Sequence, residues 1–205
     1  MNRDDALKSN PRLLDFIAKV KAAGGAAHLW GLVSDGGVHS HIDHIVALAK
    51  AVAASGLKVW LHAVTDGRDT DPHSGKEFMK RLAGAIPLSY MTGTDLKTGK
   101  GGDIVKGAEN IGVATISGRY YAMDRNKTWE RTKLAYDVMV EGCKDGGFNP
   151  LGLETVMELA YSGGESDEFV RPMPALFYPG MKDGDGLLVA NFRADRVRQI
   201  ADALA

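Results

Sequence analysis

The chain has 205 residues, of which 44% are hydrophobic and 25% charged, and its formal net charge is −1. This length suits one domain with a sizeable buried core. The near-neutral charge excludes a general nucleic-acid-binding surface, so an anion site would need local clustering of basic residues. No apolar run approaches about 18 residues and the start of the chain is charged, so we expect no membrane span and no signal peptide. The single cysteine, Cys143, excludes an internal disulfide and suits a reducing, cytoplasmic compartment.

Helix-like and strand-like segments alternate along the chain. Apolar residues recur at helical spacing in the first kind and form short continuous runs in the second. In chain order we expect a helix over 11–24, a strand over 27–33, a helix over 41–56, a strand over 57–65, a helix over 75–86, a strand over 112–118, helices over 128–142 and 152–164, an extended, proline-containing segment over 168–180, a strand over 184–192 and a helix over 193–205. This alternation predicts an α/β fold, in which one domain has a central, mostly parallel sheet flanked by helices.

The segment 92–110 interrupts the alternation. It holds five glycines and few bulky apolar residues, so we expect a loop or an excursion from the domain. Its composition is similar to that of a phosphate-binding loop, but Gly101 follows Gly99 and Lys100 at the position where such a loop requires Ser or Thr. A nucleotide-dependent enzyme is therefore a weak alternative.

Polar loops follow four of the expected strands, at 34–41, 66–75, 118–125 and 193–196. The carboxyl ends of parallel strands meet at one edge of a sheet, where open α/β sheets bind their ligands. Arginines gathered there would repel one another unless an anion neutralised them, and guanidinium groups hold carboxylates and phosphates through paired hydrogen bonds. The sequence therefore predicts a site for a small, multiply charged anion. The candidate residues are His39, Arg68, Asp69, Arg119, Arg125, Arg193 and Arg196.

Each of these loops taken alone also fits a solvated turn, and it is the repetition at four strand ends that favours a site. A cation at the start of a helix opposes the helix macrodipole, so Arg193 is hard to explain as an ordinary surface residue. Arg196 follows one helical turn later and can face the same anion. Arg198 turns away by about 200°, so we expect it on the outer face of the helix.

The histidines outside this group have simpler interpretations. His41 and His44 could share one face of a helix, with Asp43 between them. The chain lacks an HExxH pattern and a further ligand at a fixed offset, so a metal site is the weaker interpretation and we assign no metal ligand to this chain. His62 lies within an expected strand and should be a hydrogen-bonded core residue, whereas His73 should lie at the surface.

Four long stretches carry a resemblance to a known family. They are LWGLVSDGGVHSHIDH at 29–44, HAVTDGRDTDPHSG at 62–75, ATISGRYYAMDRNKTWERTKLAYD at 114–137 and VANFRADRVRQI at 189–200. With these motifs in this order, residues 10–205 strongly resemble the cofactor-independent (2,3-bisphosphoglycerate-independent) phosphoglycerate mutases. The segment 92–110 does not match closely.

The resemblance implies a two-domain enzyme that interconverts 3-phosphoglycerate and 2-phosphoglycerate. In that family a domain similar to alkaline phosphatase holds two divalent metal ions, commonly manganese, and a serine that is transiently phosphorylated. A second domain, inserted into the first, holds the glycerate during the transfer. This chain, residues 1–205, resembles the inserted transferase domain without its phosphatase-like half. On that resemblance we expect a monomer that takes part in glycolysis and gluconeogenesis and is inactive without the missing domain.

The family's substrate contacts fall on the seven candidate residues at the strand ends. Two of the arginines would hold the substrate carboxylate, and the others would face the phosphate. Asp69 would contact the glycerate hydroxyls and is a candidate general base; alternatively, it would only orient Arg68. The alternative function is a free-standing, non-catalytic sensor of an anionic phosphorylated metabolite on the same scaffold.

Overall fold

Five strands form the central sheet, in the order β6-β5-β2-β1-β7. The computed structural model describes residues 3–86, 90–91, 104–105, 110–144, 146–149, 152–176 and 178–205. The parallel strands are β1 (Ala27–Leu32), β2 (Val59–Thr65), β5 (Ile111–Gly118) and β7 (Gly186–Val189). The edge strand β6 (Met173–Pro174) runs antiparallel to β5, and β3 (Tyr90–Met91) pairs separately with β4 (Ile104–Val105). The predicted α/β fold with a mostly parallel sheet is confirmed.

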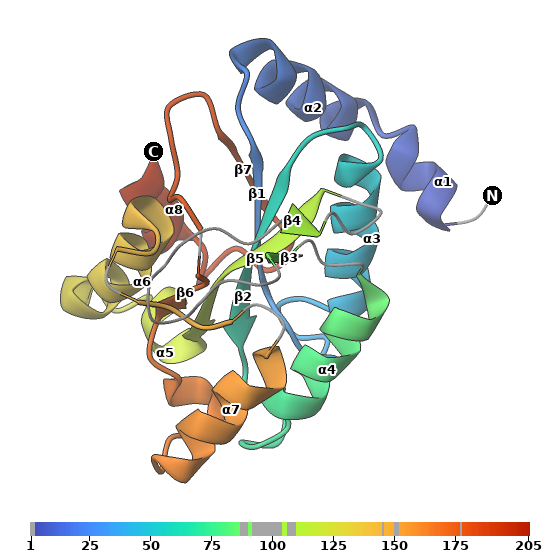
Figure 1. Cartoon of the computed structure of the whole chain (residues 1–205). Helices are drawn as coiled ribbons and strands as arrows, with labels where there is room; N and C mark the ends of the chain where they lie inside the picture. Colours follow the sequence, from blue (N-terminus) through green and yellow to red (C-terminus); the bar gives the residue numbers. More distant parts are fainter. Residues whose placement is uncertain are drawn as a thin grey trace.

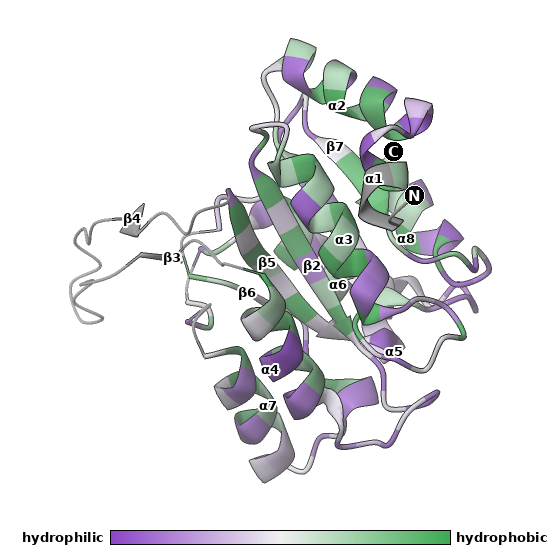
Figure 2. Ribbon diagram, turned by 90° about the vertical axis from the view of Figure 1, so that its right-hand side faces the viewer, coloured by the Kyte–Doolittle hydropathy of each residue, from purple (hydrophilic) through white to green (hydrophobic). Residues whose placement is uncertain are grey.

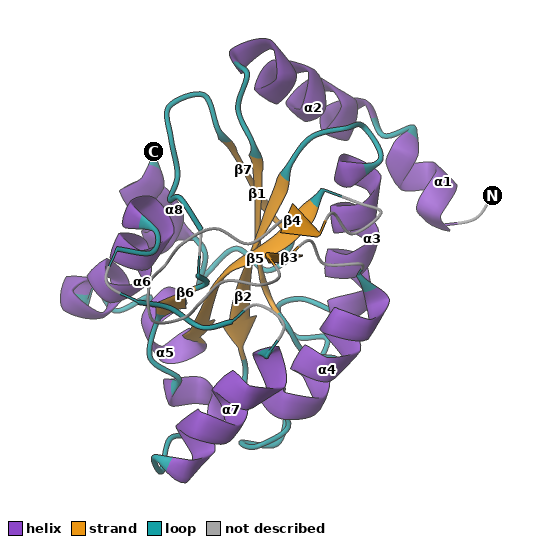
Figure 3. Ribbon diagram, in the orientation of Figure 1, coloured by secondary structure: helices purple, strands orange, loops and turns teal. Residues whose placement is uncertain are grey.

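Helices cover both faces of this sheet (Figures 1 and 3). The first face packs against α2 (Pro11–Ala23), α3 (Ile42–Ala53), α4 (Gly75–Ala85) and α7 (Leu153–Ser162). The second face packs against α5 (Arg119–Ala122), α6 (Trp129–Glu141) and α8 (Arg198–Leu204). The short helix α1 (Arg3–Lys8) precedes α2, and the 3-10 turn η1 (Asp167–Phe169) precedes β6. The sheet is therefore the middle layer of three.

The strands are mostly apolar on both sides because both sides are covered, and they are mostly green in Figure 2. Ile42 and Ile45 of α3 and Leu82 of α4 are fully buried against the first face. Each buried side chain of this size stabilises the fold by about 1.5–3 kcal/mol relative to an exposed one.

The helix α2 begins as its sequence indicates, because the Asn10 side chain accepts hydrogen bonds from the first free amides, and it ends at Gly24, which has a φ of 70°.

Several sequence-based boundaries were wrong. The last helix begins at Arg198 rather than at residue 193, and the last strand covers only four residues of the predicted 184–192. The predicted loop at 118–125 contains the helical turn α5, and the predicted extended segment at 168–180 begins inside η1. Of the glycine-rich 92–110, only β4 and Asn110 lie within the described residues, so the prediction of a loop falls outside them.

Among the described residues, no helix has the length and apolar character needed to span a membrane.

The strand order produces a switch point between β1 and β7. The chain passes from β1 to β2 and β5 in one direction and later places β7 on the other side of β1. The loops that leave β1 and β7 are tied together, because the Phe192 amide donates to the His39 carbonyl at 2.9 Å and the Leu32 amide donates to Asn191 Oδ1 at 3.0 Å. Open α/β sheets bind ligands at this position.

Candidate functional site

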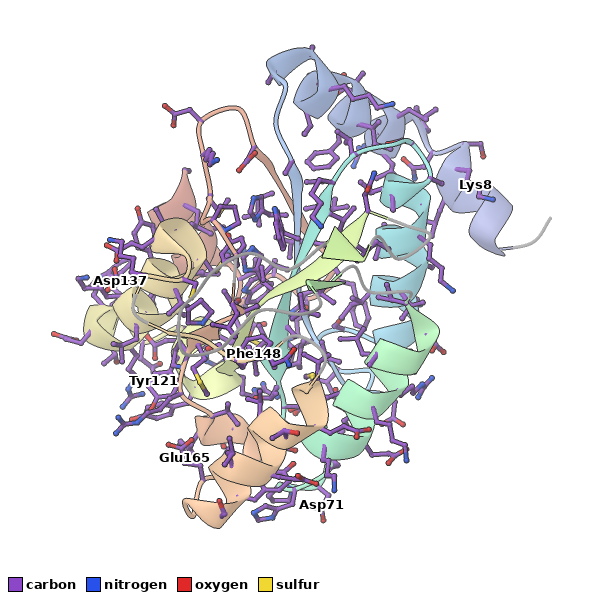
Figure 4. All side chains as sticks on the ribbon, in the orientation of Figure 1. Lys8, Asp71, Tyr121, Asp137, Phe148 and Glu165 are labelled. Atoms are coloured by element: carbon purple, nitrogen blue, oxygen red, sulfur yellow. The ribbon has the colours of Figure 1, made fainter. Side chains whose placement is uncertain are left out.

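A buried arginine forms the centre of the site. Arg119 is the first residue of α5, directly after β5, and its side chain is 3% exposed. Its Nη1 lies 2.6 Å from Asp66 Oδ1 and 2.6 Å from Asp69 Oδ2. Both aspartates come from the loop that follows β2, the strand beside β5. The parallel pairing of β2 and β5 therefore places this cation between two carboxylates at the carboxyl edge of the sheet. In Figure 4, Asp71 and Tyr121 mark the segments that follow these two strands.

Asp66 is held from three sides. The Ser34 hydroxyl donates to its Oδ2 at 2.7 Å, and the amides of Arg68 and Asp69 donate to its Oδ1 at 3.2 and 3.1 Å. Burial alone would raise the pKa of Asp66, but the hydrogen bonds from Ser34, the Asp69 amide and Arg119 outweigh it and lower the pKa. Asp66 is thus a fixed negative charge that links the loop after β1 to the loop after β2.

His39 lies between two carboxylates. Its ring is 3% exposed; Nε2 is 3.8 Å from Asp69 Oδ2, and Nδ1 is 3.8 Å from Asp195 Oδ1. These separations exceed hydrogen-bond length, and His39 Nδ1 is a buried atom without a hydrogen-bond partner among the described residues. Burial and the positive charge of Arg119 lower the pKa of His39. The histidine is therefore a neutral donor or acceptor at neutral pH, held beside the charged groups.

Two half-exposed arginines share the carboxylate of Asp195. Arg125 Nη1 lies 2.9 Å from Oδ2, and Arg193 Nε lies 2.9 Å from Oδ1. The side chains of these arginines are 48% and 50% exposed. Arg125 follows α5, whereas Arg193 and Asp195 belong to the turn before α8, so the contact joins segments from opposite sides of the sheet order.

The remaining two arginines complete the group. Arg196 donates to the Met123 carbonyl at 3.3 Å, and its pKa is lowered first by burial and then by the charges of Arg125, Arg119 and Arg68. This effect means that the four guanidinium groups are near enough to repel. Arg68 is half-exposed and lies 3.5 Å from Glu168 Oε1 of η1. All seven predicted residues thus belong to one connected cluster at the carboxyl edge.

Two predictions about this cluster need correction. Arg193 and Arg196 lie before the last helix rather than on it, and Asp195 between them pairs with Arg125 and Arg193. The prediction that the arginines need a bound anion to neutralise their charges is also incomplete, because acidic side chains of the chain itself pair with them. Sequence reasoning missed the acids that pair with them, which are Asp66, Asp195 and Glu168. Asp66 and Asp195 could have been found, since both stand within two residues of a predicted arginine.

The turn η1 packs against the two segments that carry Arg68 and Arg119. The Asp167 side chain is fully buried and accepts a hydrogen bond from the Gly75 amide at 2.6 Å, at the start of α4. Its carbonyl accepts from the Thr65 hydroxyl at 2.6 Å. Gly67 has a φ of 71°, and a Cβ there would lie 2.8 Å from the Glu168 amide; a Cβ on Gly118 would lie 2.3 Å from the Glu168 carbonyl. Both loops therefore need glycine beside η1, directly before Arg68 and Arg119.

The other histidines lie where the sequence indicated. His41 Nδ1 accepts from the Asp43 amide at 3.2 Å and so caps α3, and Asp43 pairs with Arg81 at 2.6 Å. Within the part of the chain that the structure describes, no group of three or more His, Cys, Asp or Glu is arranged to hold a metal ion. His73 is exposed, as predicted.

His62 is a hydrogen-bonded core residue, as predicted, and it belongs to a buried polar row across three strands. Its Nε2 lies 2.8 Å from His28 Nδ1, and its Nδ1 lies 2.9 Å from Thr115 Oγ1. His28 Nε2 continues the row to Asp185 Oδ2 at 3.1 Å. Burial lowers the pKa of both histidines, so the row is uncharged at its centre.

Comparison with known proteins finds relatives that match almost the whole chain. The family model described as BPG-independent PGAM N-terminus matches residues 2–205. The 2,3-bisphosphoglycerate-independent phosphoglycerate mutase of Gluconobacter oxydans is 44% identical over 203 residues, and that of Cereibacter sphaeroides (strain ATCC 17025) is 45% identical over 196 residues. These matches cover 98% and 96% of this chain but only 35% and 34% of the relatives.

A solved structure shows the same fold. The phosphoglycerate mutase of Leishmania mexicana, crystallised at low cobalt concentration, superposes with a TM-score of 0.73 at 25% identity. The superposition covers 98% of this chain and 36% of that protein. The chain spans about a third of the length of its relatives, and it belongs to the family of N-terminal regions of 2,3-bisphosphoglycerate-independent phosphoglycerate mutases.

Proposed function

We propose that this chain is the substrate-binding, transferase domain of a phosphoglycerate mutase. In this proposal it holds 3-phosphoglycerate or 2-phosphoglycerate while the phosphoryl group moves between the two oxygens. The observation that carries the proposal is the cluster of five arginines at the carboxyl edge of the sheet, three of which lie near enough to Arg196 for their charges to lower its pKa. Such a cluster complements a ligand with both a carboxylate and a phosphate.

The cluster suits the task of positioning. Its inner part is Arg119 with Asp66, both buried, and the partly exposed Asp69; hydrogen bonds of 2.6 Å hold the three side chains together. Its outer part, including Arg125 and Arg193, is half-exposed and can reach a ligand from solvent. Phosphoryl transfer depends mostly on orientation and charge stabilisation, because the protein has little covalent chemistry of its own to supply.

Asp69 is the candidate general base of the proposal. Arg119 and His39 approach its Oδ2, and its Oδ1 receives no hydrogen bond from the described residues. That oxygen is free to accept a proton from a glycerate hydroxyl. The alternative role, in which Asp69 only orients Arg68, has less support, because Arg68 pairs with Glu168 and Asp69 pairs with Arg119.

The rest of the chemistry belongs, in this proposal, to the part of the mutase outside this chain. The relatives are about three times as long as the matched segment, which favours a transferase domain over a free-standing sensor. We assign the two divalent metal ions, with manganese as the expected metal, and the phosphorylated serine to that remainder. When bound there, the metals would activate the serine and stabilise charge on the phosphoryl group.

Calorimetric titration of the chain with 3-phosphoglycerate tests the proposal. We expect binding at millimolar concentration or tighter, weakened at least about tenfold, or about 1.4 kcal/mol, by Arg193→Ala. Arg198→Ala is the matched control, because Arg198 is exposed on α8 and makes no contact with the cluster among the described residues; it should leave the affinity unchanged. Absence of binding, or equal losses in the two variants, would refute the proposal.

A further inference from the structure

Asp195 differs from the other acids of the arginine cluster in how it is held. Asp66 accepts hydrogen bonds from a serine and two backbone amides, and Asp69 is tied to the buried Arg119 at 2.6 Å. Asp195 has only Arg125, Arg193 and the more distant His39 as partners among the described residues. Its Oδ1 makes no hydrogen bond of good geometry, although it is buried. Asp195 is thus fastened to the site only by groups that are themselves candidates for binding the ligand.

The two arginines that hold Asp195 are also accessible to solvent, unlike the buried Arg119. About half of each side chain faces solvent, and the Asp195 side chain is 33% exposed. The carboxylate lies between them: Arg125 Nη1 and Arg193 Nη2 both donate to Oδ2, at 2.9 and 3.3 Å, and Arg193 Nε lies 2.9 Å from Oδ1. This is the arrangement in which a ligand carboxylate or phosphate would bind a pair of guanidinium groups. An entering anion and Asp195 therefore compete for the same hydrogen-bond donors.

We propose that Asp195 is an internal counterion of the Arg125–Arg193 pair, which an anion must displace in order to bind these two arginines. The inference rests on the proposed function and extends it, because it makes Asp195 a determinant of which anions bind. A ligand with a single negative charge only exchanges one carboxylate for another. A ligand with two or more charges gains attraction from the remaining arginines as well, so Asp195 selects for multiply charged ligands.

The charges of the cluster support this role. Five arginines face four carboxylates, those of Asp66, Asp69, Glu168 and Asp195, so these side chains together carry one net positive charge. Displacing Asp195 from its arginines exposes a second positive charge to the ligand. The three other carboxylates cannot be displaced as readily, because Asp66 and Asp69 are tied to the buried Arg119 and Glu168 lies on η1, which is packed against both loops.

Substitution of Asp195 tests the inference with inorganic phosphate as the probe. Asp195→Asn keeps the size of the side chain and removes the charge, so phosphate should bind at least about fivefold more tightly than to the wild type. Asp195→Glu keeps the charge and should remain within about twofold of the wild type on the same scale. Asp183→Asn is the matched control for loss of one charge, because Asp183 is exposed before β7, at the opposite edge of the sheet.

A purely structural role for Asp195 predicts the opposite change in phosphate affinity. If Asp195 served only to organise Arg125 and Arg193, then Asp195→Asn would bind phosphate more weakly, and that result, or an unchanged affinity, overturns the inference. Asp195→Ser also removes the charge and should bind phosphate more tightly than the wild type, so the test does not depend on the folding of a single variant. Parallel titrations with 3-phosphoglycerate separate the two proposals. Wild-type protein that binds phosphate but not 3-phosphoglycerate counts against the proposed function alone, whereas tighter phosphate binding by Asp195→Asn supports the counterion role by itself.

Discussion

Removal of the buried guanidinium of Arg119 should be one of the most destabilising single changes in the site. Arg119→Met keeps much of the side-chain volume, so the variant mainly loses the charge and its two 2.6 Å contacts. Breaking a buried ion pair on one side costs about 3–5 kcal/mol, because the other charge is left buried without a partner. Asp66 keeps its bonds to Ser34 and to two amides, and Asp69 is 22% exposed and can gain water. We therefore expect the lower end of the range, about 3 kcal/mol.

Urea unfolding at neutral pH measures this loss, provided that the slope of the transition stays constant. Arg125→Met is the matched control, because it makes the same chemical change at a half-exposed ion pair, where the loss should stay below about 1 kcal/mol. The double variant Asp66→Asn with Arg119→Met should recover part of the stability, since it removes the unpaired charge. A loss in Arg119→Met no larger than that in Arg125→Met would refute the reasoning.

Two further predictions concern the parts of the fold that carry the site. Burial lowers the pKa of His28 and His62 below the ordinary 6.5, so the unfolded chain binds protons that the folded chain excludes. The free energy of unfolding should therefore be highest above about pH 6.5 and fall as the pH is lowered to about 5. Urea midpoints at the two pH values should show a smaller fall for His62→Gln than for the wild type. Gly118→Ala should destabilise by at least about 1–3 kcal/mol, because the new Cβ meets the Glu168 carbonyl at 2.3 Å. The matched change Gly84→Ala in α4, with nothing within 4 Å, should instead stabilise by about 0.5–1 kcal/mol; equal effects of the two alanines would contradict the packing argument.

Local patterns in the sequence were enough to predict most of the sheet and the positions of the site residues. The four parallel strands are continuous apolar runs, and the rule that their carboxyl ends meet at one edge brought Arg68 and Arg119 together without knowledge of the strand order. The prediction held for these two because each directly follows a strand end through one glycine-containing turn. Proximity of this kind depends on the register of neighbouring strands alone.

Contacts between distant loops could not be predicted in the same way. The helical pattern over 193–205 forms a helix only from Arg198 on, and Asp195, in the segment before it, pairs with Arg125, 70 residues earlier in the chain. Nor does composition indicate that Asp66, rather than Asp69 alone, pairs with Arg119. These choices depend on which charges become buried together, and burial is a property of the assembled sheet and not of either loop.

The packing of η1 against the two arginine-bearing loops also determines when the site can come into existence. Thr65 and Asp167, which η1 brings into contact, are separated by 102 residues. At about 5–20 residues per second, a ribosome needs on the order of 5–20 s to make the intervening chain. During that time β1, β2 and β5 can already pair, while Arg68 and Arg119 still lack the turn that holds their loops. If the proposed function holds, a nascent chain that stops before Asp167 has the middle of the sheet without an ordered anion site, and ligand recognition begins only after η1 has been made.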